Sequence, residues 1–133
     1  MKELVIEAKS ENLDAVLDFV NDELDKAGLS EKLQMRIAIA VEEVFVNIAS
    51  YAYSTETGGA VIRVSVGDEI AIEFEDSGTP YNPLETETPN TNLDTHEREI
   101  GGLGIFMVRQ IMDAVEYRNC NGKNILTIKK NQL

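Results

Sequence analysis

The spacing of apolar residues changes from helical to alternating between residues 51 and 62 of this chain, and that change limits the folds open to it. Over 11–26 and 31–51 the apolar residues recur at helical spacing. Over 62–66 and 70–75 they alternate with polar residues, as in strands that bury one face. Helices followed by a run of strands predict an α+β fold, in which the helices cover one face of a sheet.

Turn and capping residues separate the predicted elements. Ser10 and Ser30 are expected to cap two helices that end near Lys26 and Tyr51, with Gly28 as the stop between them. The other predicted elements are, in chain order, a strand at 2–8, a hairpin of 62–66 and 70–75 turning at Gly67-Asp68, a helix from Ile105 to about Met112, and a hairpin of 114–118 and 125–129 turning at 119–123. This order predicts a two-layer arrangement on a mostly antiparallel sheet.

Length and charge narrow the classes of function. A chain of 133 residues fits one domain, 1–133, because domains usually hold about 100–150 residues. Its 24 acidic and 12 basic residues give a net charge of −12, which repels nucleic-acid phosphates and anionic membrane surfaces. We therefore expect no direct binding to nucleic acid or membrane. A nucleotide site remains compatible with this charge, since backbone amides and a metal hold small phosphate groups locally.

Export signals and metal-binding cysteines are missing from the sequence. No apolar run approaches the roughly 20 residues that span a bilayer, and residues 1–10 lack the apolar core of a signal peptide. A single cysteine, Cys120, forms no internal disulfide, and with a single histidine, His96, the chain lacks the ligands of a Cys/His zinc site. These features predict a cytoplasmic protein.

The second predicted helix carries the first candidate pair. Glu43 and Asn47 are four residues apart, so their side chains project from the same side of the helix, on the flank of its apolar stripe. A carboxylate and an amide placed this way can bind Mg²⁺ through oxygen, and the carboxylate can instead take a proton from a hydroxyl. The alternative is a solvated helix flank beside Glu42.

Asp76 and Gly78 form a second candidate directly after an apolar strand. An aspartate at the end of a strand can accept a hydrogen bond from a buried amino group of a ligand, and a glycine lets the backbone approach closely. The alternative is an ordinary turn, because Asp, Ser, Gly and Pro are the usual turn residues.

A glycine-rich segment, GGLG at 101–104, opens the helix that begins near Ile105. Amide groups at a helix N-terminus favour phosphate, and glycines keep side chains out of its approach. The stretch before it, 76–99, is polar and contains three prolines, and so long an irregular segment in a compact domain is often a functional lid. The alternative is a glycine hinge beside a flexible loop.

Taken in order, these segments resemble the nucleotide-binding motifs of the GHKL ATPase superfamily, whose domain has the Bergerat fold. Residues 40–53 resemble the N box, 74–84 the first glycine box and 97–117 the second. The resemblance covers nearly the whole chain. Within the superfamily it is most similar to the stand-alone anti-sigma factor/serine-protein kinase branch, because the second glycine box continues into the segment IMDAVEY.

The resemblance implies a role for each candidate residue. Glu43 would be the general base that activates the attacking hydroxyl, and Asn47 would ligate Mg²⁺. Asp76 would bind the adenine amino group of ATP, and Gly78 would let the base pack closely. The residues near the phosphates would be Gly102, Leu103 and Gly104, and residues 79–100 would form the lid. Arg98 could reach the phosphates from this lid, and the alternative is a surface arginine between Glu97 and Glu99.

Two positions depart from the family pattern. Tyr51 stands where many relatives carry a histidine after the N box, and we expect a packing aromatic there. Asn124 falls near the position in the last hairpin where a threonine often supports the adenine contact through water, and an asparagine can take that place. Thr127 is a second candidate by proximity.

The resemblance implies an ATP-dependent serine/threonine kinase. Its partners would be an anti-sigma-factor antagonist, which it phosphorylates, and a sigma factor, which it sequesters, and it would form a homodimer. The alternative from another class is a nucleotide-binding interaction module with little or no turnover. Because Glu43 and Asn47 are both present, the enzyme is favoured. A detached sensor histidine kinase domain is disfavoured, since the only histidine, His96, falls in the predicted lid, and gyrase-type relatives would need a further domain.

Overall fold

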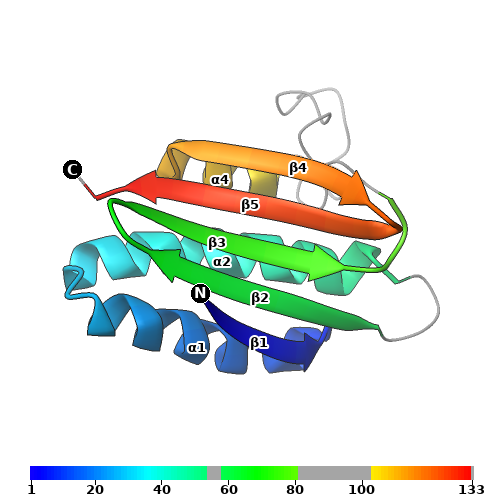
Figure 1. Ribbon diagram of the computed structural model, residues 1–133. Coiled ribbons are helices and arrows are strands. Elements are labelled where there is room, and N and C mark those ends of the chain that lie inside the picture. The colour runs from blue at the N-terminus through cyan, green and yellow to red at the C-terminus, as the bar shows by residue number, and fades with distance from the viewer. Residues whose placement is uncertain (54–57, 81–102, 133) are drawn as a thin grey trace.

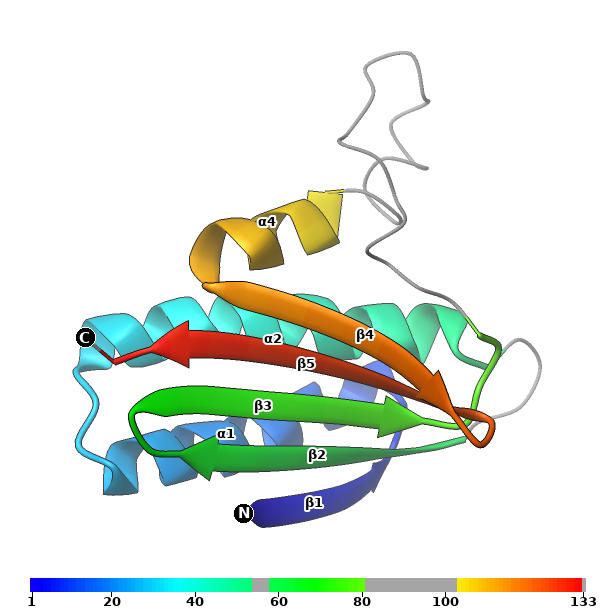
Figure 2. The same ribbon diagram turned by 45° about the horizontal axis from the view of Figure 1, so that its top comes forward.

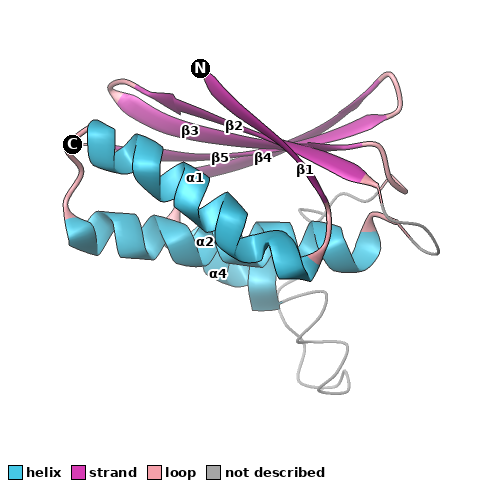
Figure 3. Ribbon diagram, turned by 90° about the horizontal axis from the view of Figure 1, so that it is seen from below, coloured by secondary structure: helices cyan, strands magenta, loops and turns pink. Residues whose placement is uncertain are grey.

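Five strands form one antiparallel sheet, and the helices pack against one of its faces (Figures 1 and 3). The computed structural model describes residues 1–53, 58–80 and 103–132. The strands lie in the order β1-β2-β3-β5-β4. Their bounds are Lys2–Glu7 for β1, Gly59–Val66 for β2, Glu69–Asp76 for β3, Ala114–Cys120 for β4 and Lys123–Asn131 for β5. The prediction of a two-layer α+β fold is confirmed.

The helical layer has α2, Glu31–Tyr51, at its centre. On one side lies α1, Leu13–Lys26, and on the other lies α4, Leu103–Ile111 (Figures 1 and 2). Within the described residues, no helix is both long enough and apolar enough to cross a membrane.

The ends of α1 and α2 test the capping predictions. Ser30 caps α2 as expected, since its Oγ accepts a hydrogen bond from the Leu33 amide at 3.2 Å. Gly28 follows α1 with φ of +80°, a left-handed conformation that glycine adopts without strain. The prediction that Ser10 caps α1 is wrong. A 3₁₀ turn, Ser10–Asn12, joins β1 to α1, and Asn12 before α1 donates its side-chain amide to the Glu7 carbonyl at 3.0 Å.

The last hairpin is tighter than predicted. Its strands extend to Cys120 and from Lys123, so the turn contains only Asn121 and Gly122. Their φ values of 54° and 80° are those of the primed turns that suit two-residue hairpins. The longer strand brings Asn124 into register with Asp76 of β3.

The core lies between the sheet and the helices. In β2 and β3 every second residue points toward the helical layer and is buried, as the alternating pattern predicts. The largest fully buried side chains are Phe45, Phe74, Leu24, Ile37, Ile62, Ile70, Ile72, Ile128, Val16, Val20, Val41 and Val108. Two polar side chains are buried among the described residues, Asp76 at 7% exposure and Asn124 at 6%. Both lie at the same end of the sheet, on the helical side.

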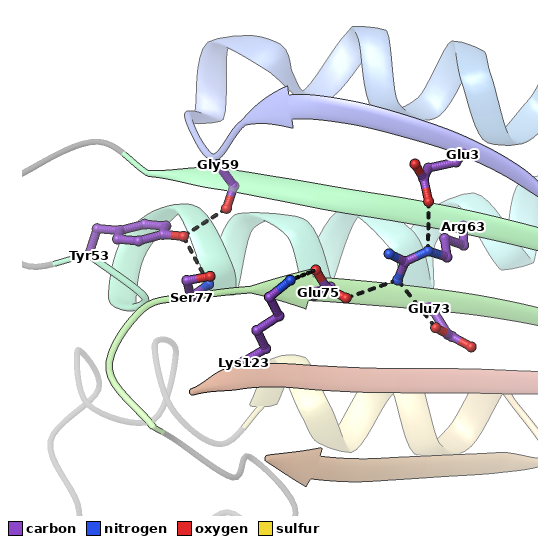
Figure 4. Close-up of polar contacts among 8 residues, drawn as sticks. All are labelled: Glu3, Tyr53, Gly59, Arg63, Glu73, Glu75, Ser77 and Lys123. Carbon is purple, nitrogen blue, oxygen red and sulfur yellow. Dashed lines mark hydrogen bonds and ion pairs between the residues drawn. The ribbon is translucent and has the colours of Figure 1, made fainter. Parts of the chain in front are cut away.

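The opposite face of the sheet carries an ion network centred on Arg63 (Figure 4). Its guanidinium lies 2.8 Å from Glu3, 3.1 Å from Glu75 and 3.5 Å from Glu73, and Lys123 lies 3.4 Å from Glu75. Burial acts to raise the pKa of Glu75, but hydrogen bonds from Arg63 and Lys123 outweigh it, so this pKa is lower than usual. The network ties four neighbouring strands together.

Substituting Arg63→Met should lower the free energy of unfolding by about 1–2 kcal/mol near pH 7, because the carboxylates lose their shared cation while the apolar stem is kept. The lowered pKa of Glu75 stabilises the fold above the pKa of the unfolded chain, and this contribution disappears as pH falls through the folded pKa. Urea unfolding should therefore show that Arg63→Met loses less free energy of unfolding at about pH 3 than near pH 7. Lys129→Met is a control, because its partner Glu116 is 59% exposed. An equal loss at both pH values would contradict this account.

Candidate functional site

A cavity of about 50 Å³, partly open to solvent, lies where the C-terminal half of α2 meets the end of β3. Its polar lining includes Glu43, Asn47, Asp76, Thr79, Tyr117 and Asn124, and the rest is mostly apolar, from α2, α4 and β5. The fold thus brings together five side chains that the sequence singled out in three separate segments, namely Glu43, Asn47, Tyr51, Asp76 and Asn124.

Glu43 and Asn47 form the α2 wall of the cavity, and both are half-buried. Burial raises the pKa of Glu43, and the adjacent Glu42 carboxylate adds to that effect. A carboxylate with a raised pKa holds a proton more strongly than a solvated one, which suits it to accept a proton from a hydroxyl.

The donor set at Asn47 is small. Within the parts of the chain that the structure describes, no three His, Cys, Asp or Glu side chains lie close enough to hold a metal ion. An amide oxygen at Asn47, one helical turn from a carboxylate, suits Mg²⁺ that takes its other ligands from phosphates and water. These residues therefore fit a magnesium ion that arrives with a nucleotide.

Asp76 forms the β3 wall of the cavity, and its side chain is held in one orientation. Its Oδ1 accepts a hydrogen bond from the Gly78 amide at 2.9 Å and another from the Asn124 side chain at 2.9 Å. Asn124 also donates to the carbonyl oxygens of Gly78 at 3.3 Å and Thr79 at 3.2 Å. Asn124 therefore contacts the predicted adenine-binding aspartate directly. Thr127, the second candidate, lies on the other face of the sheet, paired with Glu73.

Gly78 lies against the end of α2. A Cβ at this position would come closer than 3.0 Å to the carbonyl oxygen and carbon of Ala52, which real Cβ atoms essentially never do. The next residue, Thr79, donates its amide to the same Ala52 oxygen at 2.7 Å. The close approach predicted for Gly78 is thus made to the protein's own backbone. Its approach to a bound base stays a prediction.

Tyr53 contributes a contact that the sequence did not reveal. Its hydroxyl accepts a hydrogen bond from the Ser77 amide at 3.0 Å and donates one to the Gly59 carbonyl at 2.7 Å (Figure 4). It therefore ties the end of α2 to both β2 and β3, next to Asp76. A tyrosine just past a helix shows no pattern that points to these partners, because they lie on other elements.

The remaining predicted residues lie at the cavity's edge or beyond the described part. Leu103 and Gly104 begin α4, and Ile105 of the same turn lines the cavity, so the N-terminal end of this helix lies beside it. Tyr51 lines the cavity and is 38% exposed, rather than packed away in the core. Outside the described residues lie Arg98, Gly102 and lid positions 81–100.

Comparison with known proteins indicates the family of the chain. Residues 6–130 match the histidine kinase-like ATPase domain family. Serine/threonine-protein kinase BtrW of Bordetella bronchiseptica is 26% identical over 102 residues, covering 74% of this chain and 71% of that protein. Serine-protein kinase RsbW of Listeria monocytogenes is 27% identical over 111 residues, covering 78% of this chain and 70% of that protein.

A solved structure has the same fold. The match is to a chain in the SiaB-SiaC complex from Pseudomonas aeruginosa, with a TM-score of 0.56 and 12% identity, covering 96% of this chain and 88% of that one. The family match and the kinase names of the relatives agree with the sequence resemblance to GHKL ATPases of the serine-protein kinase branch. Since the family match extends over nearly the whole chain, this protein belongs to the histidine kinase-like ATPase domain family.

Proposed function

We propose that this chain is an ATP-dependent serine/threonine protein kinase of the anti-sigma-factor type. It would phosphorylate a small antagonist protein and sequester a sigma factor. The observation that carries the proposal is a single cavity with Glu43, whose pKa is raised, on one wall and the buried Asp76 on another. The relatives named as serine kinases support the same class of reaction.

The cavity suggests how ATP would lie. Its adenine would lie against Asp76, whose carboxylate accepts a hydrogen bond from the exocyclic amino group. Its phosphates would extend toward Asn47 and the N-terminal end of α4, where free amides favour negative charge. Asn47 would hold Mg²⁺ through its amide oxygen, and the bound ion supplies charge neutralisation at the phosphates.

Glu43 would carry the proton transfer. It accepts the proton of a serine hydroxyl on the partner as the hydroxyl oxygen bonds to the γ-phosphorus of ATP. The bond from that phosphorus to the bridging oxygen breaks, and ADP leaves. The remaining catalysis comes from positioning, as in phosphoryl transfer generally.

The partners and location belong to the same proposal. We infer that the protein forms a homodimer and lies in the cytoplasm. We also infer that it does not contact nucleic acid or membrane directly, because its net charge is −12. The lid at 79–100, with Arg98, would cover the phosphates.

Two measurements test this function. Mg·ATP at 100 times its Kd should raise the free energy of unfolding by about 2.7 kcal/mol, seen as a higher melting temperature. In an extract of the protein's own cells, γ-labelled ATP and the purified chain should label a small protein on serine. A shift in melting without labelling would instead favour the nucleotide-binding module. Absence of the shift would contradict every nucleotide-binding function.

A further inference from the structure

A row of exposed side chains precedes Glu43 on α2. At about 100° per residue, the row and Glu43 lie within about 60° of one another around the helix axis, so they share one side of the helix. Two members of the row are exposed cations, and the third is an isoleucine that is 41% exposed. We call these residues the α2 row: Lys32, Arg36 and Ile39.

The α2 row lies on the far side of Glu43 from the nucleotide phosphates. In the proposed complex the phosphates extend toward Asn47, one helical turn after Glu43, and toward the N-terminal end of α4. A rise of about 1.5 Å per residue places Arg36 about 10 Å before Glu43 along the helix axis, and about 16 Å before Asn47. The attacking hydroxyl lies in line with the leaving oxygen, on the opposite side of the γ-phosphorus. The segment that carries this hydroxyl would therefore lie over the α2 row.

The cations of the row are available to a carboxylate from another protein. Within the described residues, the side chains of Lys32 and Arg36 form no ion pair and no hydrogen bond. Other basic side chains already have carboxylate partners, namely Lys9, Lys26, Arg63, Lys123, Lys129 and Lys130. The net charge of −12 repels an acidic partner at long range, so the exposed cations supply a local attraction beside Glu43.

Ile39 adds an apolar contact between the cations and Glu43. It lies about 6 Å before Glu43 along the helix axis, and burying its exposed surface against an apolar side chain is favourable. An extended peptide rises about 3.3 Å per residue, so about three residues span the distance from Glu43 to Arg36. Starting from Glu43, such a peptide would meet an apolar side chain first and a cation next.

We propose that the α2 row selects the protein substrate by binding an acidic side chain about three residues from the serine that is phosphorylated. The serine hydroxyl would lie at Glu43, an apolar neighbour would pack on Ile39, and the carboxylate would pair with Arg36. An arginine can hold a carboxylate through two parallel hydrogen bonds, which gives this contact direction as well as charge. This inference rests on the proposed function, because it names the substrate of the same site.

The test uses two synthetic peptides with a central serine and the same apolar neighbours. One carries Glu at the third residue before and after the serine, and the other carries Lys at both places. The unmodified chain should phosphorylate the Glu peptide with a KM about fivefold lower and a similar kcat, and added salt should reduce this preference. Arg36→Glu should reverse the preference, because the charge that faces the peptide is inverted, while the Kd for Mg·ATP stays unchanged.

Matched controls separate the row from a general effect of charge or apolar surface. Arg118→Glu makes the same change of charge at an exposed position of β4 and should leave the preference unchanged. Ile39→Ser should raise the KM of both peptides by about threefold and keep the preference. Met35, another exposed apolar residue of α2, lines a groove with Asn21 of α1, so Met35→Ser should leave both KM values unchanged.

The outcomes distinguish this inference from the proposed function. If the unmodified chain treats both peptides alike, or if Arg36→Glu still prefers the Glu peptide, the inference is overturned while the proposed function stands. If neither peptide is phosphorylated, the protein labelled in the cell extract decides. Arg36→Glu should label it about fivefold more slowly and Arg118→Glu at the unmodified rate, and equal rates overturn the inference. If the unmodified chain labels nothing from Mg·ATP, both are overturned.

Discussion

Replacing Glu43 with Gln should lower the rate of phosphoryl transfer by about 10²–10⁴-fold while leaving the affinity for Mg·ATP nearly unchanged. Glutamine keeps the size of the side chain but cannot accept the proton of the attacking hydroxyl. Single-turnover transfer from labelled ATP gives the rate, and calorimetry gives the Kd. If transfer survives in the variant, Glu43 is not the base.

The pH dependence of transfer provides a sharper form of this prediction. Burial and the adjacent Glu42 raise the pKa of Glu43, so the ionised base is lost earlier on acidification than for a solvated glutamate. The rate should fall as pH drops through that pKa. Glu42→Gln is the matched control, because it removes one cause of the shift and should move the acidic limb to lower pH. If the acidic limb of the pH profile does not move in Glu42→Gln, the assignment of Glu43 as the base is contradicted.

The same raised pKa has a consequence for stability. A group whose pKa is higher in the folded state than in the unfolded state stabilises the fold below the unfolded pKa, and this contribution is lost as pH rises. Ionised Glu43 therefore costs stability at neutral pH. We expect Glu43→Gln to melt at a higher temperature near pH 7 but to show little gain near pH 4. A loss of stability at neutral pH would show that the variant damages the fold.

Substituting Gly78→Ala should destabilise the protein by about 3 kcal/mol, a fall in melting temperature of roughly 10 °C. The added Cβ would overlap the carbonyl group of Ala52 at the end of α2, and a backbone carbonyl cannot move aside as a flexible side chain can. Relief would require the segment after β3 to shift, breaking the 2.7 Å hydrogen bond from Thr79 to Ala52. Thermal melting without nucleotide measures the effect.

Gly67→Ala is the control for this substitution. Gly67 lies in the turn between β2 and β3, and a Cβ there would meet nothing within 4 Å. Its substitution should change the melting temperature far less. If Gly78→Ala keeps its stability and loses only affinity for ATP, the glycine serves the bound base and not the contact with α2.

Several features of the fold were predictable from local pattern. The helical and alternating spacings placed each helix and strand, and the Ser30 cap and Gly28 stop were confirmed. The errors have local causes too. Ser10 lies in a 3₁₀ turn, because the chain passes directly from β1 into α1 there. The last hairpin turns at Asn121 and Gly122, because its strands pair over more residues than their apolar alternation covers.

The site was predictable only in part. Glu43, Asn47 and Asp76 could be named because each stands in a recognisable position on its own helix or strand, and all three line one cavity. The hydrogen bonds that fix the surroundings of these residues could not be predicted from the sequence. Tyr53 reaches Ser77 across 24 positions, and nothing in its immediate neighbourhood indicates that contact.

The sequence alone determined which elements form and named side chains that line one cavity, because spacing, capping and residue type act over a few neighbouring positions. Tertiary structure alone decided how those side chains are oriented. Asn124 bonds to Asp76 across 48 positions because β5 pairs with β3, and Gly78 contacts Ala52 because α2 ends beside the same strand. Such contacts depend on strand order and on how helices pack against the sheet, which no short segment of the sequence encodes.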